Sequence, residues 1–293
     1  MPQFRKSSLG LLGFAAAVGL GAAACLSNTP PSYLLTTQQA ALLTQSLALD
    51  AEGEIADATA TGATVVFTDA PPVSNVGPSD PQCSTITRSP ASPIDGDLDG
   101  VPDSVRFTFN ACVLLYPAES DTLRGVIDIL DPTMAADQAV KRIFTNMVRA
   151  RLRSGKLSTE TWNGTRTTTR DANTLQHSET NFRTDYLFPT GDAAIQVRTW
   201  TSSFTADVAG SIMADQTLPS GNWNFTGTSS WTYGANAYSI AAATSTAMHY
   251  NASCTATPRF DAGTLAAVVT LGTQTSTVTL RFTACGVVSG TQT

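Results

Sequence analysis

"SVRFTFNAC", residues 104–112, is the stretch that decides the fold class. Val105, Phe107 and Phe109 alternate with more polar neighbours, and a period of two residues is typical of a strand with one buried and one exposed face. In a helix the apolar residues would recur every three or four positions instead. The stretch therefore predicts a β-strand.

The segments around this strand predict further strands and turns. "RGVIDIL" at 124–130 alternates in the same way. "AVKRIFTNMVRARL" at 139–152 also fits a helix, but the alternation of its last residues favours a strand. Threonine, which favours strands, is frequent from residue 157 onward, and "DANT" at 171 and "GANA" at 234 are typical of hairpin turns. The sequence predicts an all-β fold, an antiparallel meander that forms a sandwich or a partly open barrel.

One short helix is expected before the β domain. "TTQQAALLTQSLALD" at 36–50 contains Leu42, Leu43 and Leu47 with several alanines, and its first threonines are suited to cap a helix. "ATVVFTDA", which follows, predicts a strand. We assign residues 25–60 to a tether and helix and residues 61–293 to one Thr/Ser-rich β domain.

The first 24 residues are typical of an export signal. Arg5 and Lys6 precede the apolar run "LGLLGFAAAVGLGAAA", which ends in small residues. A permanent transmembrane helix needs about 20 apolar residues, so cleavage is the better interpretation. The sequence predicts an exported protein.

Cleavage after Ala24 would place Cys25 at the new N-terminus. "GAAAC" resembles the lipobox of bacterial lipoproteins, whose cysteine is lipidated, although Ala22 stands where leucine is usual. Ordinary signal-peptidase cleavage at Ala24 therefore stays open. The resemblance implies attachment to a membrane through an N-terminal lipid. Leu26 follows the cysteine, as in lipoproteins sorted to the outer membrane, so we expect an outer-membrane, periplasmic or cell-surface location.

Cysteine arithmetic agrees with lipidation, because five cysteines leave one over in an exported protein. "CSTITR" at 83 resembles "CTATPR" at 254, and "VRFTFNAC" at 105 resembles "VTLRFTAC" at 278. This internal repeat predicts two similar units, each a pair of strands joined by a disulfide. The predicted disulfides, chosen from three possible connectivities, are Cys83–Cys112 and Cys254–Cys285.

"DGDLDGVPD", residues 95–103, has the spacing of a calcium-binding loop. Asp95, Asp97 and Asp99 occupy positions 1, 3 and 5, Gly100 follows at position 6, and Asp103 lies at position 9. Carboxylate and carbonyl oxygens are the ligands that Ca²⁺ prefers, and Val101 at position 7 would supply a carbonyl. The alternative is an Asp/Gly-rich turn without a metal.

The loop resembles thrombospondin type 3 and dockerin loops more than an EF-hand. Position 12 is Arg106, where an EF-hand has a bidentate glutamate. Water or a distant carboxylate such as Asp80, Glu119 or Asp121 would have to complete the coordination. No histidine or nucleophile lies beside the loop in the sequence, so we interpret the calcium as structural.

Other patterns exclude several classes of function. Net charge is −6 with scattered basic residues, which argues against nucleic-acid binding. No Walker loop, nucleophile elbow, dinucleotide-binding motif or zinc motif is present. His177 and His249 lie alone in strand-like segments, and the four tryptophans are more typical of core packing than of a sugar-binding surface.

These observations favour a non-enzymatic lipoprotein of the bacterial cell envelope, structural or ligand-binding, whose partner is an envelope protein, a glycan or a small apolar ligand. One alternative is an exported carbohydrate-active hydrolase with an acidic pair that the sequence does not identify. A second alternative is an open-barrel carrier of an apolar ligand.

Overall fold

A computed structural model describes most of the β domain and a few residues before it. The described residues are 34–36, 40, 43–44, 47, 86–115, 119–133, 139–153, 155–187, 191–213, 216–256 and 258–293. All of them belong to one compact unit, Tyr33–Thr293.

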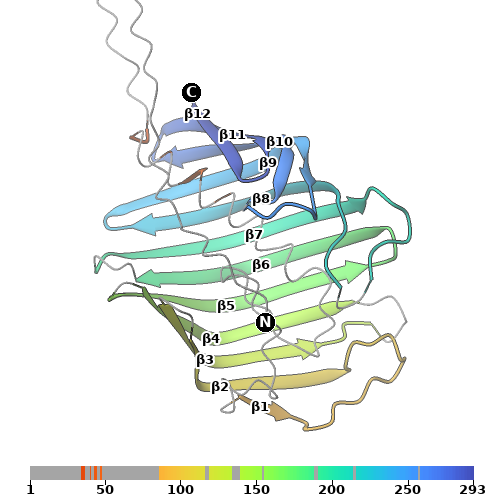
Figure 1. The fold of residues 1–293 in the computed structure, drawn as a ribbon. Coiled ribbons are helices and arrows are strands. Elements are labelled where there is room, and N and C mark those ends of the chain that lie inside the picture. Colours follow the sequence, from red (N-terminus) through yellow and green to blue (C-terminus); the bar gives the residue numbers. More distant parts are fainter. Residues whose placement is uncertain are drawn as a thin grey trace, which may run out of the picture. The chain divides into compact units, whose positions relative to one another are not determined.

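The described β residues form one continuous sheet of twelve antiparallel strands in sequence order (Figure 1). The strands are β1 Ile86–Ser89, β2 Ser104–Leu115, β3 Glu119–Leu130, β4 Val140–Arg153, β5 Lys156–Arg170, β6 Thr174–Leu187, β7 Ala193–Ala206, β8 Gly221–Tyr233, β9 Asn236–Tyr250, β10 Phe260–Leu271, β11 Gln274–Ala284 and β12 Val287–Gln292. Among the described residues the sheet is an open meander that does not close into a barrel, and the predicted all-β antiparallel meander is confirmed.

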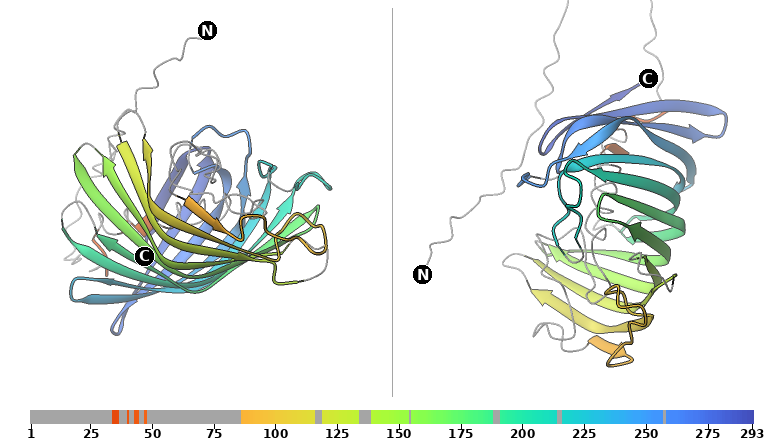
Figure 2. Two further views of the ribbon diagram at one scale, coloured as in Figure 1. Left: turned by 90° about the horizontal axis from the view of Figure 1, so that it is seen from below. Right: turned by 90° about the vertical axis from the view of Figure 1, so that its right-hand side faces the viewer.

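The sheet buries one face, as the alternation in the sequence predicts. Val105, Phe107 and Phe109 of β2 are buried, and the residues between them are more exposed. With no second sheet in the described chain to cover this face, the strands curl around it (Figure 2). One buried apolar cluster extends over β1–β6. A second extends over β6–β11 and is built around Trp200 and Trp223.

A series of β-bulges helps to bend the sheet. Each of the neighbouring strands β2 to β6 holds a residue with positive φ at or beside a register shift: Ala111, Gly125, Asn146, Gly164 and Asn181. An extra residue in one strand increases the local twist and bend. Gly125 has φ +119° and an added Cβ would lie 2.3 Å from the Asn146 carbonyl oxygen, so this approach needs glycine.

The two ends of the sheet carry different connections. The loop end (right in Figure 1) holds the connections that follow odd-numbered strands, including the long segments 90–103, 131–139, 207–220 and 251–259. The hairpin end (left) holds those that follow even-numbered strands, such as 154–155, 234–235 and 272–273. In an antiparallel meander, successive connections alternate between the two ends. The loops with room for a site therefore share one end of the sheet.

Of the two elements predicted before the sheet, only the helix is partly described. Ala40, Leu43, Thr44 and Leu47 are helical, and the Ala40 N–H donates to the Thr36 carbonyl at 2.9 Å. Leu47 is buried in the second apolar cluster, as expected of one face of a helix. The rest of the predicted helix at 36–50 and the predicted strand "ATVVFTDA" lie outside the described residues.

The internal repeat is only half confirmed. β2 and β11 match in their buried residues, since Val278, Leu280 and Phe282 take the places of Val105, Phe107 and Phe109. "CSTITR" ends in strand β1, but "CTATPR" is part of the loop between β9 and β10. Pro258, which lacks a backbone N–H to donate to a sheet, stands where the first copy has Thr87. The second unit is still a pair of strands, β10 and β11, joined by the disulfide Cys254–Cys285, but its first strand begins after the motif instead of within it.

Candidate functional site

The predicted calcium loop is a compact turn between β1 and β2 at the loop end. Asp95 accepts backbone hydrogen bonds with both carboxylate oxygens, from Leu98 at 2.8 Å and Gly100 at 3.0 Å. Gly100 has φ +91°, a conformation that favours glycine. The Val101 side chain, fully buried in the first apolar cluster, fixes the loop to the sheet. The loop is therefore a turn in which the Asp95 carboxylate faces the backbone of the loop itself.

Three of the predicted ligands converge. Asp95, Asp97 and Asp99 each offer a carboxylate oxygen, and these atoms lie within 4.8 Å of one another. Asp103 instead accepts a hydrogen bond from the Gly96 N–H at 2.8 Å. The side chain at position 12 cannot contribute, because the Arg106 guanidinium is a cation without an acceptor atom; it makes a two-pronged ion pair with Asp128 at 2.6 and 2.9 Å.

The structure adds one carboxylate that sequence reasoning missed. Asp131 follows β3 directly, and Leu130 pairs with Ser104 in the register of β2 and β3. The Asp131 N–H accordingly donates to the Asp103 carbonyl at 3.3 Å. The strand patterns of 104–115 and 119–130 carry the signal for this neighbour, because pairing the two strands places Asp131 beside Asp103. Of the suggested distant carboxylates, Asp121 is engaged elsewhere, and Asp80 and the side chain of Glu119 lie outside the described residues.

The converging carboxylates destabilise one another in the absence of a cation. Burial raises the pKa of Asp99 above its ordinary value, and the charges of Asp97, Asp131 and Asp95 raise it further, against the hydrogen bond that the Val101 N–H donates to it. The Oδ2 atoms of Asp97 and Asp131 are buried and accept no hydrogen bond from any described residue. Oxygen atoms in this situation are suited to a hard cation.

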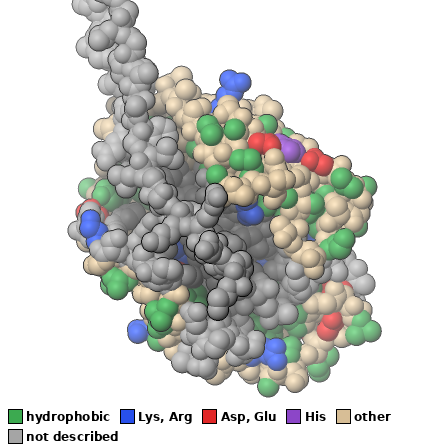
Figure 3. Space-filling view, in the orientation of Figure 1, with side chains coloured by type: hydrophobic (Ala, Val, Ile, Leu, Met, Phe, Trp, Pro, Cys, Tyr) green, Lys and Arg blue, Asp and Glu red, His purple; other side chains and the backbone are tan. Residues whose placement is uncertain are grey.

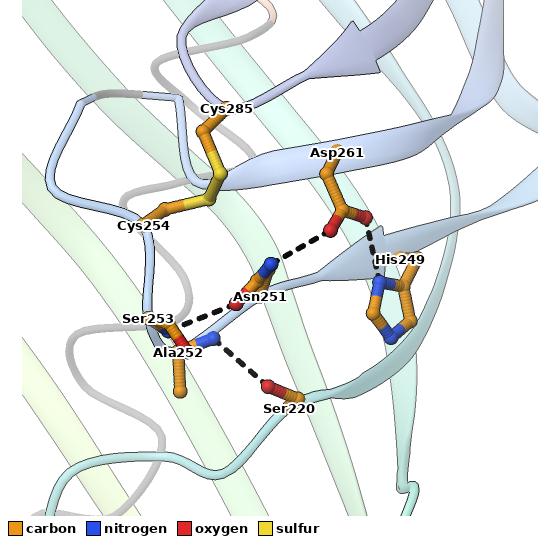
Figure 4. The surroundings of a disulfide bond; sticks show 8 residues. All are labelled: Ser220, His249, Asn251, Ala252, Ser253, Cys254, Asp261 and Cys285. Carbon is orange, nitrogen blue, oxygen red and sulfur yellow. Dashed lines mark hydrogen bonds and ion pairs between the residues drawn. A yellow bond between two sulfur atoms is a disulfide. The ribbon is translucent and has the colours of Figure 1, made fainter.

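A second polar cluster lies on β9 and β10 at the same end (Figure 4). His249 faces Asp261 through Nδ1 at 2.6 Å and Asp207 through Nε2 at 2.9 Å. Carboxylates only accept hydrogen bonds, so this geometry requires the doubly protonated imidazolium. The hydrogen bond to Asp207 is the largest cause that raises the pKa of His249. A histidine between two acidic side chains is visible at the surface in Figure 3.

The His249 cluster joins three segments of the chain. Asp207 begins the connection between β7 and β8, and Asn251 donates to the second oxygen of Asp261 at 2.8 Å. Because the two ring nitrogens point at carboxylates on opposite sides, the three side chains do not converge on one point where a metal could bind. The arrangement is an ion-pair clasp.

The predicted disulfide Cys254–Cys285 is confirmed, with Cα atoms 5.6 Å apart (Figure 4). It joins the connection between β9 and β10 to the end of β11. Cys112 is also disulfide-bonded and buried. Its predicted partner Cys83 lies outside the described residues, so the pairing of Cys83 with Cys112 stays a prediction.

The centre of the buried face carries ion pairs between the two apolar clusters. Glu179 is buried between Arg198 at 2.8 Å and Arg166 at 2.7 Å. Burial raises the pKa of Glu179. The charges of Arg198, Arg166 and His177 have the larger, opposite effect and lower the pKa to about 2. The Arg166 guanidinium lies 4.3 Å from the centre of the Phe182 ring, a cation–π contact.

Asp121 forms a second ion-paired group on this face. It lies 2.7 Å from Arg149 and 3.1 Å from Arg151. A glycosidase needs one carboxylic acid with a raised pKa and a second carboxylate across the substrate. Glu179, held ionised by its arginines, does not have the property of such an acid. Burial raises the pKa of Asp121, but both of its carboxylate oxygens accept hydrogen bonds from Arg149 and Arg151.

The remaining sequence candidates fall in the sheet. His177 of β6 is buried, with its Nδ1 2.9 Å from Thr168 Oγ1. Trp200 and Trp223 are core residues, as predicted. Cys25 and the predicted signal peptide lie outside the described residues. In the part of the chain that the structure describes, no helix has the length and apolar character needed to cross a membrane.

The functional assignment rests on the geometry of the site, because comparison with known proteins assigns no family. The chain matches no protein-family model, and no curated protein sequence or solved structure is detectably similar to it.

Proposed function

We propose that the protein is a non-enzymatic, exported lipoprotein of the bacterial cell envelope, with a structural calcium ion in the loop 95–103. Its β domain serves a structural or ligand-binding role, toward an envelope protein, a glycan or a small apolar ligand. The observation that carries the calcium site is the convergence of Asp95, Asp97 and Asp99 within 4.8 Å. Asp131 is a further ligand candidate, because its backbone N–H donates to the Asp103 carbonyl and its Oδ2 is buried without a hydrogen bond from any described residue.

The position of the loop supports a structural role for the ion. Asp131 comes from the connection between β3 and β4, whereas the other aspartates precede β2. An ion held by both would tie two connections together at the edge of the first apolar cluster, where Val101 is buried. The hydrogen bonds that its aspartates accept within the loop come from backbone N–H groups of the loop itself, as expected of a structural turn.

Cysteine pairing supports the lipid anchor. Cys254 and Cys285 form one disulfide, and Cys112 is in another. If Cys83 is the partner of Cys112, Cys25 is the cysteine left for acylation. Mass spectrometry of the mature N-terminus tests this, and an unmodified N-terminus would contradict it.

The calcium site is tested by thermal unfolding with and without the ion. Calcium at about 10⁻⁴ to 10⁻³ M, the range of extracellular modules, should raise the melting temperature, since an ion that binds only the folded state stabilises it by mass action. Asp97→Asn with Asp99→Asn should abolish this response, and Asp192→Asn, a surface aspartate of the hairpin end, should retain it. Equal melting curves of the wild type with and without calcium would mean that the loop is a bare acidic turn.

A pH series sharpens the same test. The folded-state pKa of Asp99 is above its ordinary value of 3.8, so the contribution of Asp99 to the stability of the calcium-free protein should be lost as pH rises from below 3.8 through the raised pKa, against the gain from Glu179, whose pKa is lowered. Asp99→Asn should remove that part of the pH dependence and leave the calcium-free protein at least as stable as the wild type at neutral pH. Excess calcium should reverse the sign for the wild type, because it favours the ionised carboxylate.

A further inference from the structure

The hairpin end of the sheet exposes five large aliphatic side chains, which we call the leucine strip. Leu115 is 66% exposed, Leu157 53%, Leu152 44%, Leu187 43% and Val113 39%. The five side chains point away from the buried face. Leu114 and Asp121, which pair with each other beside the strip, are buried, and successive residues of a strand point to opposite faces. Exposed aliphatic residues are normal when scattered over a surface, but a contiguous group marks an interaction site.

The strand register shows that the strip is contiguous. Leu115 pairs with Ser120, Ser120 with Leu152, and Leu152 with Leu157. A second row runs beside the first, and its successive partners are Val113, Thr122, Ala150, Thr159, Leu187 and Ala193. Paired residues on one face lie about 5 Å apart. The leucine strip therefore crosses β2 to β6 as two adjacent rows.

Charged residues of both signs border the strip. The ten residues of the two rows include no charged side chain. Lys156 and Arg124 are exposed beside the rows, and so is Asp192, which precedes Ala193 of the second row. Asp185, one row further in, is paired with Arg183 at 2.7 Å. Uncharged aliphatic rows are suited to the interface of a bilayer, where Lys156 and Arg124 can meet anionic headgroups.

We propose that the leucine strip rests on the surface of a lipid bilayer, with the loop end turned away from it. The inference rests on the proposed lipid anchor for its geometry. Leu34, packed against the second apolar cluster, follows Cys25 by nine residues, and an extended chain spans at most about 3.3–3.6 Å per residue. An acylated Cys25 thus holds the domain within about 30 Å of the membrane, and the strip supplies a second contact of lower affinity.

Binding of the protein to vesicles tests the proposal. The full chain with Cys25→Ser, which cannot be acylated, should sediment with vesicles of phosphatidylethanolamine and phosphatidylglycerol. Adding Leu152→Ser and Leu157→Ser should weaken the partition by about tenfold or more. Tenfold corresponds to only about 1.4 kcal/mol, less than the burial of one leucine can contribute. Lys156→Glu should weaken it further on anionic vesicles but little on phosphatidylcholine.

A matched control separates the strip from exposed apolar surface in general. Val208 and Met213 are 67% and 59% exposed in the connection between β7 and β8, at the loop end. Val208→Ser with Met213→Ser should leave the partition unchanged, and circular dichroism should show that both double variants are folded. Equal partition of the two double variants would overturn the proposal. So would a stable dimer that the leucine substitutions dissociate, because the strip would then bind a second copy.

The result is independent of the lipid anchor itself. Leucine-dependent partition of a protein whose native N-terminus carries no lipid would keep the inference and remove the proposed lipoprotein function. An acylated N-terminus combined with leucine-independent partition would keep the lipoprotein function and remove the inference.

Discussion

The two ends of the sheet are made from the same strands but differ in almost every other property. The loop end holds the long connections, the converging aspartates of 95–103, the His249 clasp and the disulfide Cys254–Cys285. The hairpin end holds short turns and the leucine strip. An antiparallel meander separates its connections in this way whatever the sequence is, so each end can be specialised without disturbing the other.

The two kinds of contact need different kinds of backbone. Polar groups that converge need backbone that can turn around them, and long loops supply it. A flat contact with a membrane needs only side chains in register, and strand ends joined by tight turns supply that. The loop end is therefore the place for ions and specific ligands, and the hairpin end is the place for a broad apolar surface.

The largest effect on stability is expected at the disulfide of the loop end. Cys254 and Cys285 are 31 residues apart, and a disulfide that closes a loop of this size stabilises by about 3–4 kcal/mol in the chain-entropy account. Cys254→Ser with Cys285→Ser should lower the free energy of unfolding by about this amount in urea titrations. A loss below about 1 kcal/mol would mean that the loop end is held by its hydrogen bonds and ion pairs instead.

Sequence reasoning predicted the parts of this fold that depend on local pattern. The alternation of Val105, Phe107 and Phe109 was enough for β2, and the two turns at 171 and 234 followed from their residue types. The β-bulges were not predicted, although a signal was present: the buried residues of β2 change from odd to even numbers between Phe109 and Cys112. Such a change of parity means that one extra residue, here Ala111, interrupts the strand.

The sequence predicted the acidic loop but not the His249 clasp or the leucine strip, because the residues of the last two lie far apart in the chain. The aspartates of 95–103 lie within nine residues of one another, so their spacing reveals the loop. His249, Asp207 and Asp261 come from three segments and meet only because β7 to β10 pair in one register. The leucine strip has the same origin, since Leu115 and Leu157 are neighbours only across two intervening strands. Contacts of this kind require the sheet order, which the sequence does not state.

A medium effect is expected from pH at the His249 clasp. The folded-state pKa of His249 is above its ordinary value of 6.5, so its stabilising contribution is complete below 6.5 and is lost as pH rises through the folded-state pKa. The clasp is about one-third exposed, and we expect a contribution of about 1 kcal/mol or less. Urea titrations at pH 5.5 and 8.5 should show this loss in the wild type.

Variants of the clasp identify the group that titrates and the role of Asp207 in raising its pKa. His249→Gln should abolish the pH dependence that the wild type shows above pH 6.5. Asp207→Asn should weaken it more than a surface change such as Asp192→Asn, because the hydrogen bond to Asp207 is the largest cause of the raised pKa. Equal pH dependence in the wild type and His249→Gln would assign the effect to another group.

The smallest effect on stability is expected at the hairpin end. Leu152 and Leu157 are exposed on the outer face, so replacing each with serine should change the free energy of unfolding by less than about 0.5 kcal/mol. Leu123 of β3 lies on the buried face of the sheet and is fully buried, so Leu123→Ala should lower the free energy of unfolding by about 2–5 kcal/mol. This contrast, measured in urea with the same protein, decides whether the strip is a surface at all. If Leu152→Ser and Leu157→Ser cost as much as Leu123→Ala, the two leucines belong to the packing of the fold, and the hairpin end differs from the loop end only in the length of its turns.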